Sequence, residues 1–214
     1  MDSQAGISGR TQAAFTARLS AHFPVGTFDA HPETVFGLLP NYQISYVNSA
    51  WLRFAAENNG QPRIGASWGP GANYLDAIAA PLRPFFERLL ARAADADGAL
   101  HPVTHEYECS TPSLYRRFAM RVYGLPARGG FVIVNSLMLE QPHDESARPV
   151  HEPDLAVYTN ADGLVVQCAH CRLVRQGKDP ERWEWVPQWV ESSPPATSHG
   201  VCGICLDYYY PVDA

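Results

Sequence analysis

The sequence has no long apolar run and little positive charge. No stretch approaches the roughly 18 consecutive apolar residues of a membrane-spanning helix, so no transmembrane segment is predicted. The first twenty residues lack a basic start followed by an apolar block, so no secretory signal is visible and a cytoplasmic location is expected. The sequence has 16 basic and 22 acidic residues, so its net charge is −6, which disfavours binding to nucleic acid or to anionic membranes.

Short motifs that carry enzyme chemistry are also missing. The sequence has no phosphate-binding loop, no nucleophile-elbow phrase and no H-E-x-x-H pair. We therefore predict that the protein is not an enzyme. What the 214 residues do contain is 46% apolar and 11% aromatic residues, which is enough to bury a core in one or two ordered domains.

Four of the five cysteines form two pairs near the C-terminal end. Cys168 and Cys171 make one C-x2-C, Cys202 and Cys205 make another, and 30 residues separate the pairs. Each such turn can direct two thiolates at one point, and two turns complete a four-sulfur cage suited to zinc. Inside a cell, paired cysteines favour a metal over disulfides, and two structural disulfides or four free thiols are the alternatives.

A four-sulfur zinc site is closed to water, so it is expected to be structural rather than hydrolytic. Four thiolates outweigh the charge of the ion, so nearby donors must offset the excess. The candidates for that role are His170, Arg172, Arg175 and His199. His199 is also a rival fourth ligand. The same cysteines suit an iron–sulfur cluster, a redox switch that exchanges metal for disulfides or, against the charge balance, a zinc ribbon that binds nucleic acid.

The N-terminal part is predicted to begin with an amphipathic helix over residues 11–23. Its apolar residues recur at helical spacing, at Phe15, Leu19 and Phe23. Such a helix can pack on its own domain or pair two chains, and we expect a homodimer in which it takes part. Pro24 and Gly26 are expected to end it.

A hairpin that runs directly into a capped helix follows. Residues 34–38 and 44–47 are strand-like, and Asn48 is predicted to cap a helix over residues 49–57. The text of this segment, ISYVNSAWLRFAAENN, resembles a PAS domain, a sensor family of bacterial signal transduction. The resemblance covers roughly residues 30–140 and implies an α+β fold with a five-stranded antiparallel sheet and flanking helices.

The rest of that segment agrees with the family in order and length. Helices are predicted over residues 75–94, with a division at two prolines, and strands over 103–109, 114–125 and 131–139. The first of these strands should place His105, Tyr107 and Cys109 on one face, opposite Thr104, Glu106 and Glu108. The last strand is apolar on both faces, as expected of a central strand.

A PAS core normally encloses a cavity that can hold a cofactor. Residues 75–94 contain no histidine for haem, and the Asn-Cys-Arg-Phe phrase of flavin-photoadduct domains is missing. The cavity is therefore expected to be filled by side chains or to take a small organic ligand without a covalent bond. The candidates to line it are Tyr46, Trp51, Phe54, Trp68, Tyr74, Phe118 and Asn135. The six aromatic side chains are explained equally well as core. Asn135 or Ser136 should face inward, bonded to backbone or, alternatively, to a ligand.

The C-terminal segment resembles a tail found on bacterial PAS and receiver proteins. That tail reads Cys-x2-Cys-x-x-Ile-Arg, a helix with tryptophan, Ser-His-Gly-Ile-Cys-x2-Cys and Tyr-Tyr-Pro. This chain departs from it with His170 inside the first pair and with valine at 174 and 201. Trp183, Trp185 and Trp189 are expected to form the core of this module.

These patterns predict four segments along the chain. They are a helical extension over 1–33, a PAS-like sensor domain over 34–140, a linker over 141–155 and a four-cysteine zinc module over 156–214. The expected function is that of a non-enzymatic sensor or adapter. It would bind a small ligand or a signalling partner and pass on a conformational change. The sequence names neither the ligand nor the partner.

Overall fold

The computed structural model describes residues 17, 25–58, 67–95 and 101–211. The predicted helix over residues 11–23 lies outside the described residues, apart from Ala17. The first complete element is the short helix α2, Val25–Asp29. Gly26, which was expected to end the preceding helix, lies inside α2.

The contacts within the chain divide it into two compact units. The first consists of Met1–Ile78, Arg83–Thr104 and Met120–Ser136, and the second of Ala79–Leu82, His105–Ala119 and Leu137–Ala214. The predicted domain boundaries remain predictions. We describe each unit by itself.

The hairpin and helix at the start of the first unit have the predicted bounds. Strands β1, Thr34–Leu38, and β2, Ile44–Val47, pair in antiparallel fashion and lead into helix α3, Ser49–Glu57. The side chain of Asn48 accepts hydrogen bonds from Trp51 N at 2.9 Å and Val35 N at 3.0 Å. The predicted cap is therefore confirmed, and it also joins the helix to β1.

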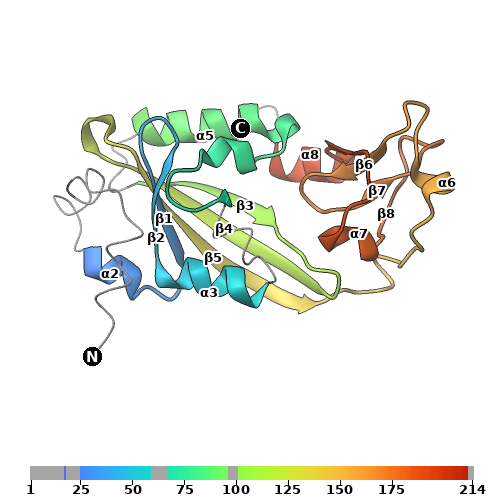
Figure 1. Ribbon diagram of the computed structural model, residues 1–214, viewed down its shortest axis with the longest axis horizontal. Coiled ribbons are helices and arrows are strands. Elements are labelled where there is room, and N and C mark those ends of the chain that lie inside the picture. The colour runs from blue at the N-terminus through green and yellow to red at the C-terminus, as the bar shows by residue number, and fades with distance from the viewer. Residues whose placement is uncertain (1–16, 18–24, 59–66, 96–100, 212–214) are drawn as a thin grey trace. The chain divides into compact units, whose positions relative to one another are not determined.

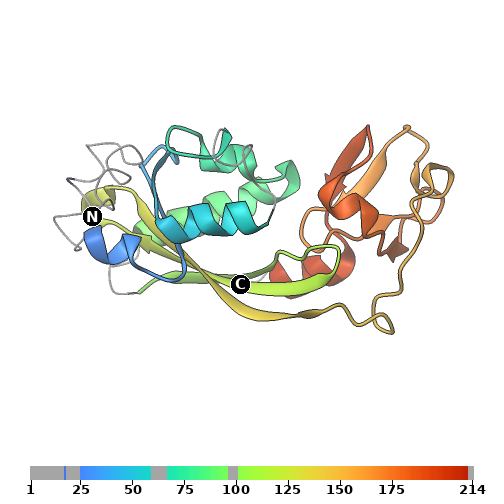
Figure 2. The same ribbon diagram turned by 60° about the horizontal axis from the view of Figure 1, so that its bottom comes forward.

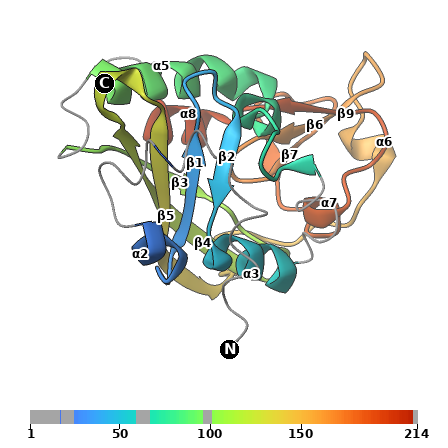
Figure 3. The same cartoon turned by 60° about the vertical axis from the view of Figure 1, so that its left-hand side comes forward.

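A five-stranded antiparallel sheet carries the fold, in the order β2-β1-β5-β4-β3. Its later strands are β3, Val103–Glu108, β4, Leu114–Gly124, and β5, Phe131–Pro142. β5 is central, and Figure 3 shows β1 between β2 and β5. With the order strand–strand, helices, then three strands, the predicted α+β class and sheet are confirmed.

Helices and 3-10 turns lie between β2 and β3. They are the turns η1, Tyr74–Ala77, and η2, Ala80–Leu82, and helix α5, Arg83–Asp95. Figure 2 shows α3 and α5 on the same face of the sheet. α5 buries Phe86, Leu89, Leu90 and Ala93. In the part of the chain that the structure describes, no helix has the length and apolar character needed to span a membrane.

β5 has the central position that its apolar faces predicted. Burial on both faces is confined to its first part, Phe131–Ile133, since Leu137 and Met138 are about half exposed. In β3, Glu108 is buried, whereas Glu106, which alternation places on the same face, is exposed. The carboxylate of Glu108 is paired with the guanidinium of Arg148, which is 40 positions away in the sequence.

The C-terminal part of the second unit has a small sheet of its own, in the order β8-β7-β6-β9. Its strands are β6, Val165–Cys168, β7, Val174–Arg175, β8, Trp183–Glu184, and β9, Thr197–Gly200. Helices α6, Leu155–Tyr158, α7, Gln188–Glu191, and α8, Gly203–Tyr209, accompany these strands (Figure 1).

Trp189 and Trp185 are buried, as expected of core residues. Trp189 packs in a cluster with Tyr158, Val165, Val174 and Val186. Trp183 lies against the cysteines instead. The tryptophans therefore divide between the core and the surroundings of the sulfur cluster.

Candidate metal centre

The two cysteine pairs meet because the strands that lead into them are neighbours. β6 and β9 pair in parallel, and Cys168 lies opposite Gly200 in this register. Parallel strands run in the same direction, so their C-terminal ends lie at one edge of the sheet. The first pair begins at the end of β6 and the second begins two residues after β9, which brings all four sulfurs to that edge.

The first pair sits in a tight turn. Cys168 N donates to Leu173 O at 2.7 Å, and Arg172 N donates back to Cys168 O at 3.1 Å. Arg172 adopts a left-handed backbone conformation, with φ of 65°. This reversal leads the chain into β7.

The second pair lies at the start of α8. Cys202 is the residue before the first turn of that helix, and Cys205 follows within the turn, so residues three apart share one side. The N–H of Cys202 points at the first pair and donates to the sulfur of Cys168 at 3.4 Å. A backbone N–H directed at a sulfur is a common way to stabilise a thiolate.

The four sulfur atoms form a compact and buried group. They lie within 4.8 Å of one another, and none of the four residues is more than 3% exposed. The sulfurs of Cys171 and Cys202 are 3.7 Å apart. A tetrahedron of sulfurs about 2.3 Å from a central ion has edges of about 3.8 Å, so this set fits a single tetrahedral metal ion.

The protonation of the thiols also suits a metal. Hydrogen bonds from Cys171, Cys202, Cys205 and the Cys202 N–H hold the pKa of Cys168 well below its usual value. The same network and burial raise the pKa of Cys171. Without a metal the group therefore keeps protons on part of its sulfurs, and a divalent cation would replace those protons.

His170, inside the first pair, joins the knuckle to β3. Its Nε2 accepts a hydrogen bond from Glu108 N at 3.2 Å, and its ring stacks on Tyr209 with centroids 3.8 Å apart. Burial lowers the pKa of His170 to about 4, so the ring is neutral near pH 7 with its proton on Nδ1. The role of His170 as a neighbour that offsets the thiolate charge stays a prediction.

The other predicted neighbours differ in their positions. Arg175 lies with its guanidinium 5.9 Å from the centre of the Trp183 ring. Arg172 is half-buried, and His199 is exposed on β9. The close group of candidate ligand atoms contains the four sulfurs and no histidine nitrogen among the described residues, so the sulfurs, not His199, make up the set.

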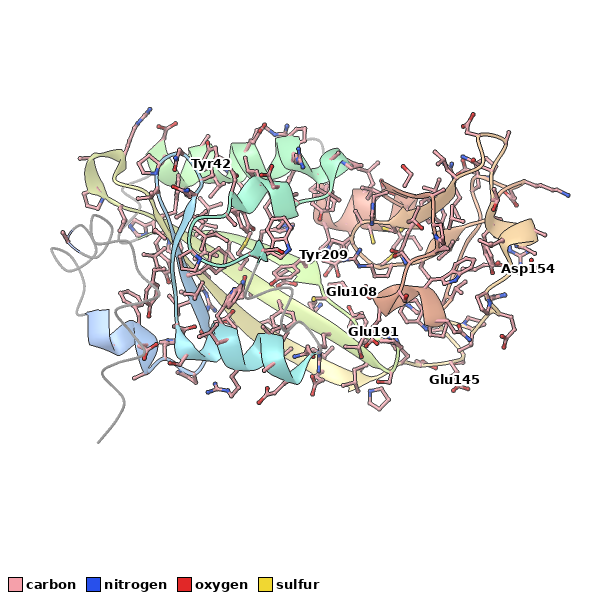
Figure 4. All side chains as sticks on the ribbon, viewed as in Figure 1. Tyr42, Glu108, Glu145, Asp154, Glu191 and Tyr209 are labelled. Atoms are coloured by element: carbon pink, nitrogen blue, oxygen red, sulfur yellow. The ribbon has the colours of Figure 1, made fainter. Side chains whose placement is uncertain are left out.

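Two charged residues at this centre were missed by the sequence reasoning. The guanidinium of Arg148 donates two hydrogen bonds to the carboxylate of Glu108, at 2.9 and 3.3 Å. Both residues line one pocket of about 480 Å³ that Cys171, Cys202 and Cys205 also line. Figure 4 labels Glu108 and Tyr209, which both line this pocket.

A local signal for Arg148 was present in the sequence. Asp144 and Ser146 form a turn in which Asp144 Oδ1 accepts from Ser146 N at 2.9 Å, and Arg148 N donates to Asp144 O at 2.8 Å. Asp-x-Ser is a typical turn sequence. It indicates an ordered turn within the predicted linker, but not the residue that Arg148 binds.

The residues predicted to line a pocket in the PAS-like segment do not form one group. Tyr74 packs against Phe36 and Phe86, at centroid distances of 5.6 and 6.3 Å. Tyr46 packs in a different cluster, with Val35 and Val132. Val35 and Phe36 are neighbours in β1, so their side chains lie on opposite faces of the sheet. Tyr46 packs with Val35 and Tyr74 packs with Phe36, so the two tyrosines also lie on opposite faces.

The remaining candidates are buried to different degrees. Trp51 and Phe54 on α3 are half-buried, as is Trp68. Phe118 is buried and stacks on Tyr107 at 5.6 Å within the second unit.

Asn135 and Ser136 have different environments. Ser136 is buried, and its Oγ accepts a hydrogen bond from Arg121 at 2.9 Å. The side-chain oxygen of Asn135 is buried and has no hydrogen-bond partner among the described residues. The structure therefore gives Ser136 a side-chain partner rather than the expected backbone partner, and Asn135 keeps an acceptor available to a ligand or water.

Comparison with known proteins adds little to this picture. No protein-family profile matches the chain, and no curated protein matches it. Among solved structures, it is similar to the photoactive yellow protein domain of the sensor histidine kinase Ppr from Rhodospirillum centenum. The two are 14% identical, with a TM-score of 0.35, over 53% of this chain and 93% of that domain. A similarity of this size says nothing of ligand or activity, so the fold assignment rests on the sheet order described above.

Proposed function

We propose that the chain is a non-enzymatic signalling protein in which a PAS-like sensor domain is combined with a structural zinc site. The observation that carries the zinc site is the buried cage of four sulfurs within 4.8 Å of one another. All four positions of a tetrahedral ion would be taken by protein, so no position is left for water or substrate. Cys168, Cys171, Cys202 and Cys205 would hold the ion, and its role would be to fold the segment around it.

Zinc is favoured over an iron–sulfur cluster by the size of the cage. A cluster of several irons and sulfides must lie between the thiolates and therefore calls for a wider cage. Tetrahedral thiolate sets of the size seen here are typical of a single ion, with zinc the common occupant.

The zinc proposal predicts that Cys202→Ser removes the metal and unfolds residues 156–214. Zinc-finger peptides gain on the order of 10–16 kcal/mol from their metal, far more than a small module with little core can replace. Elemental analysis of purified protein should give one zinc per chain, with no visible absorption. The variant should bind none and lose amide protection in that segment, while β1, β2 and α3 keep theirs.

Cys109→Ser is the matched control, because Cys109 is exposed and lies outside the sulfur group. It should bind zinc as the wild type does. A brown protein with iron, or protein prepared without oxygen that contains two disulfides and no metal, would contradict the proposal.

The sensor or adapter role rests on the PAS resemblance of residues 30–140 and on the sheet order. We propose that this domain binds a small organic ligand or a signalling partner. Asn135 supports the ligand, since its buried side-chain oxygen has no partner among the described residues. Thermal shifts with small aromatic and aliphatic compounds, for wild type and Asn135→Leu, would test this.

Three further parts of the proposal concern the setting of the protein. We propose a homodimer that uses residues 11–23, a cytoplasmic location and the absence of enzyme activity. The mass in solution, by light scattering, tests the first. A monomer at all concentrations would rule it out.

One observation favours a second candidate, a thiol redox switch. The sulfurs of Cys171 and Cys202 are 3.7 Å apart, so a small movement would allow a disulfide. Two thiolates would lose two electrons to a peroxide, which is reduced to water, and the metal would be released. Zinc release at low peroxide concentration, reversed by a dithiol, would support this candidate.

A further inference from the structure

Arg148 stands out because it is a partly buried cation in a segment without regular structure. Residues 143–154, which we call the strap, follow β5 and contain no helix or strand. The strap is nevertheless attached. His151 N donates to Trp185 O at 2.9 Å, and the rings of His143 and Trp185 are 4.6 Å apart.

The contacts of Arg148 are specific to an arginine. Its two terminal nitrogens bind both oxygens of Glu108, and its guanidinium lies 5.0 Å from the ring centre of Trp185 and 5.8 Å from that of Tyr115. A planar fork that pairs with a carboxylate and stacks on aromatic rings is a geometry that lysine cannot reproduce.

Glu108 connects this cation to the cysteines. Its side chain is only 4% exposed, and its oxygen Oε1 also accepts from Ser110 at 2.6 Å. Its backbone N–H donates to His170, between the first two cysteines. One residue of β3 therefore holds the strap with its side chain and the first knuckle with its main chain.

Arg148 is also close enough to the sulfurs to be affected by their charge. It lines the same pocket as Cys171, Cys202 and Cys205. Burial works against the charged guanidinium, but the bonds to Glu108 favour it, and the pKa of Arg148 is raised as a result. A metal bound by four thiolates keeps excess negative charge, and a nearby, partly buried cation lowers the cost of that charge.

We propose that Arg148 is the cation that completes the metal centre, and that through Glu108 it fastens the strap to it. The metal and the strap then stabilise each other: binding of the metal favours the docked strap, and the docked strap tightens binding of the metal. A signal that moves the strap would change the stability of the metal centre, and loss of the metal would release the strap. This inference rests on the proposed zinc site and adds a regulation to it.

Two substitutions separate the charge of Arg148 from its shape. Arg148→Gln removes the charge but keeps an N–H that can bond Glu108, which protects the fold. Arg148→Lys keeps the charge but loses the paired bonds and the stacking. Arg128→Gln is the control, because Arg128 is exposed and pairs with Asp95 in the other unit.

The experiment measures zinc affinity by competition with a chromogenic chelator, and strap mobility by cleavage with a glutamate-specific protease after the exposed Glu145 (Figure 4). We expect Arg148→Gln to bind zinc about 10-fold more weakly, as is typical when a neighbour of the ligands is lost. Arg148→Lys should lose less zinc affinity than Arg148→Gln, because it keeps the charge but loosens the strap. Both should be cleaved several-fold faster in the zinc-loaded state, while Arg128→Gln matches the wild type.

The outcomes distinguish the two proposals. If wild type binds zinc and Arg148→Gln binds it as tightly as Arg128→Gln, the role of Arg148 is overturned and the zinc site stands. If wild type binds no zinc, the proposed function fails, and the compensating role of Arg148 fails with it. Cleavage of Arg148→Lys at the wild-type rate overturns the fastening of the strap in either case.

Discussion

At the scale of single residues, buried polar groups that bind several partners explain most of the surroundings of the four cysteines. Glu108 is the main example, since its carboxylate binds Arg148 and Ser110 while its N–H binds His170. A buried carboxylate without a cation is costly, so Glu108 and Arg148 depend on each other. Strand alternation placed Glu108 on one face with Glu106 but could not show that it is buried, because the pattern does not show which distant residue will neutralise a charge.

His105 gives a prediction for pH. Burial, with the neighbouring His170 as a smaller cause, lowers the pKa of His105 to about 4 from an ordinary value of 6.5. Below pH 6.5 the histidine is protonated in the unfolded chain, whereas in the folded protein it stays neutral down to about pH 4. The free energy of unfolding therefore decreases as the pH is lowered from 6.5 to about 4. Between pH 7.5 and 5 the loss due to His105 should be about 2 kcal/mol.

Urea unfolding of wild type and His105→Phe at the two pH values measures this difference. The variant should lose about 2 kcal/mol less than wild type over the same interval, because the titrating group is gone. Acid effects on the thiolates are common to both proteins and cancel in the comparison. Equal losses in the two proteins would contradict a neutral, buried His105.

At the scale of elements, one strand pairing and one buried side chain position the neighbouring segments. The parallel pair of β6 and β9 brings the cysteine pairs together, with Cys168 opposite Gly200. In the first unit, Asn48 joins β1 to α3. Its Nδ2 also donates to Phe28 O at 3.0 Å and to Glu33 O at 2.9 Å.

Asn48→Ala should therefore cost much more than a single helix cap. Loss of a cap costs about 1 kcal/mol, and each buried backbone group left without a partner adds about 1–3 kcal/mol. We expect the free energy of unfolding to fall by about 3 kcal/mol or more, measured by urea titration with tyrosine and tryptophan fluorescence.

Asn41→Ala is the matched control for this prediction. The side chain of Asn41 accepts one exposed hydrogen bond, from Gln43 N at 3.2 Å. Its removal should change stability by less than about 0.5 kcal/mol. Equal effects of the two substitutions would show that Asn48 does not hold the hairpin and the helix together.

At the scale of the whole molecule, the features that were predicted correctly have local signals. The hairpin and helix over 34–57 have their predicted bounds because turn residues, alternation and a cap lie within a few positions of one another. The four cysteines lie together as predicted. The prediction was possible because two C-x2-C turns in one chain are typical of a shared metal site.

The features that were not predicted depend on contacts between distant parts of the chain. The β6–β9 pairing joins residues about 30 apart, and Arg148 binds Glu108 across 40 positions. Tyr46 and Tyr74 were both predicted as candidates to line one cavity. The sheet register places them on opposite faces, and a register cannot be read from either strand alone.

X-ray absorption at the zinc edge, on wild-type protein purified with its metal, tests the central claim most directly. Four sulfur neighbours at about 2.3 Å, with no nitrogen or oxygen in the first shell, are the result that the structure predicts. A first shell that contains nitrogen or oxygen would mean that a histidine or water completes the site. Absence of zinc, with scattering from neighbouring iron atoms instead, would replace the structural zinc site with a cluster.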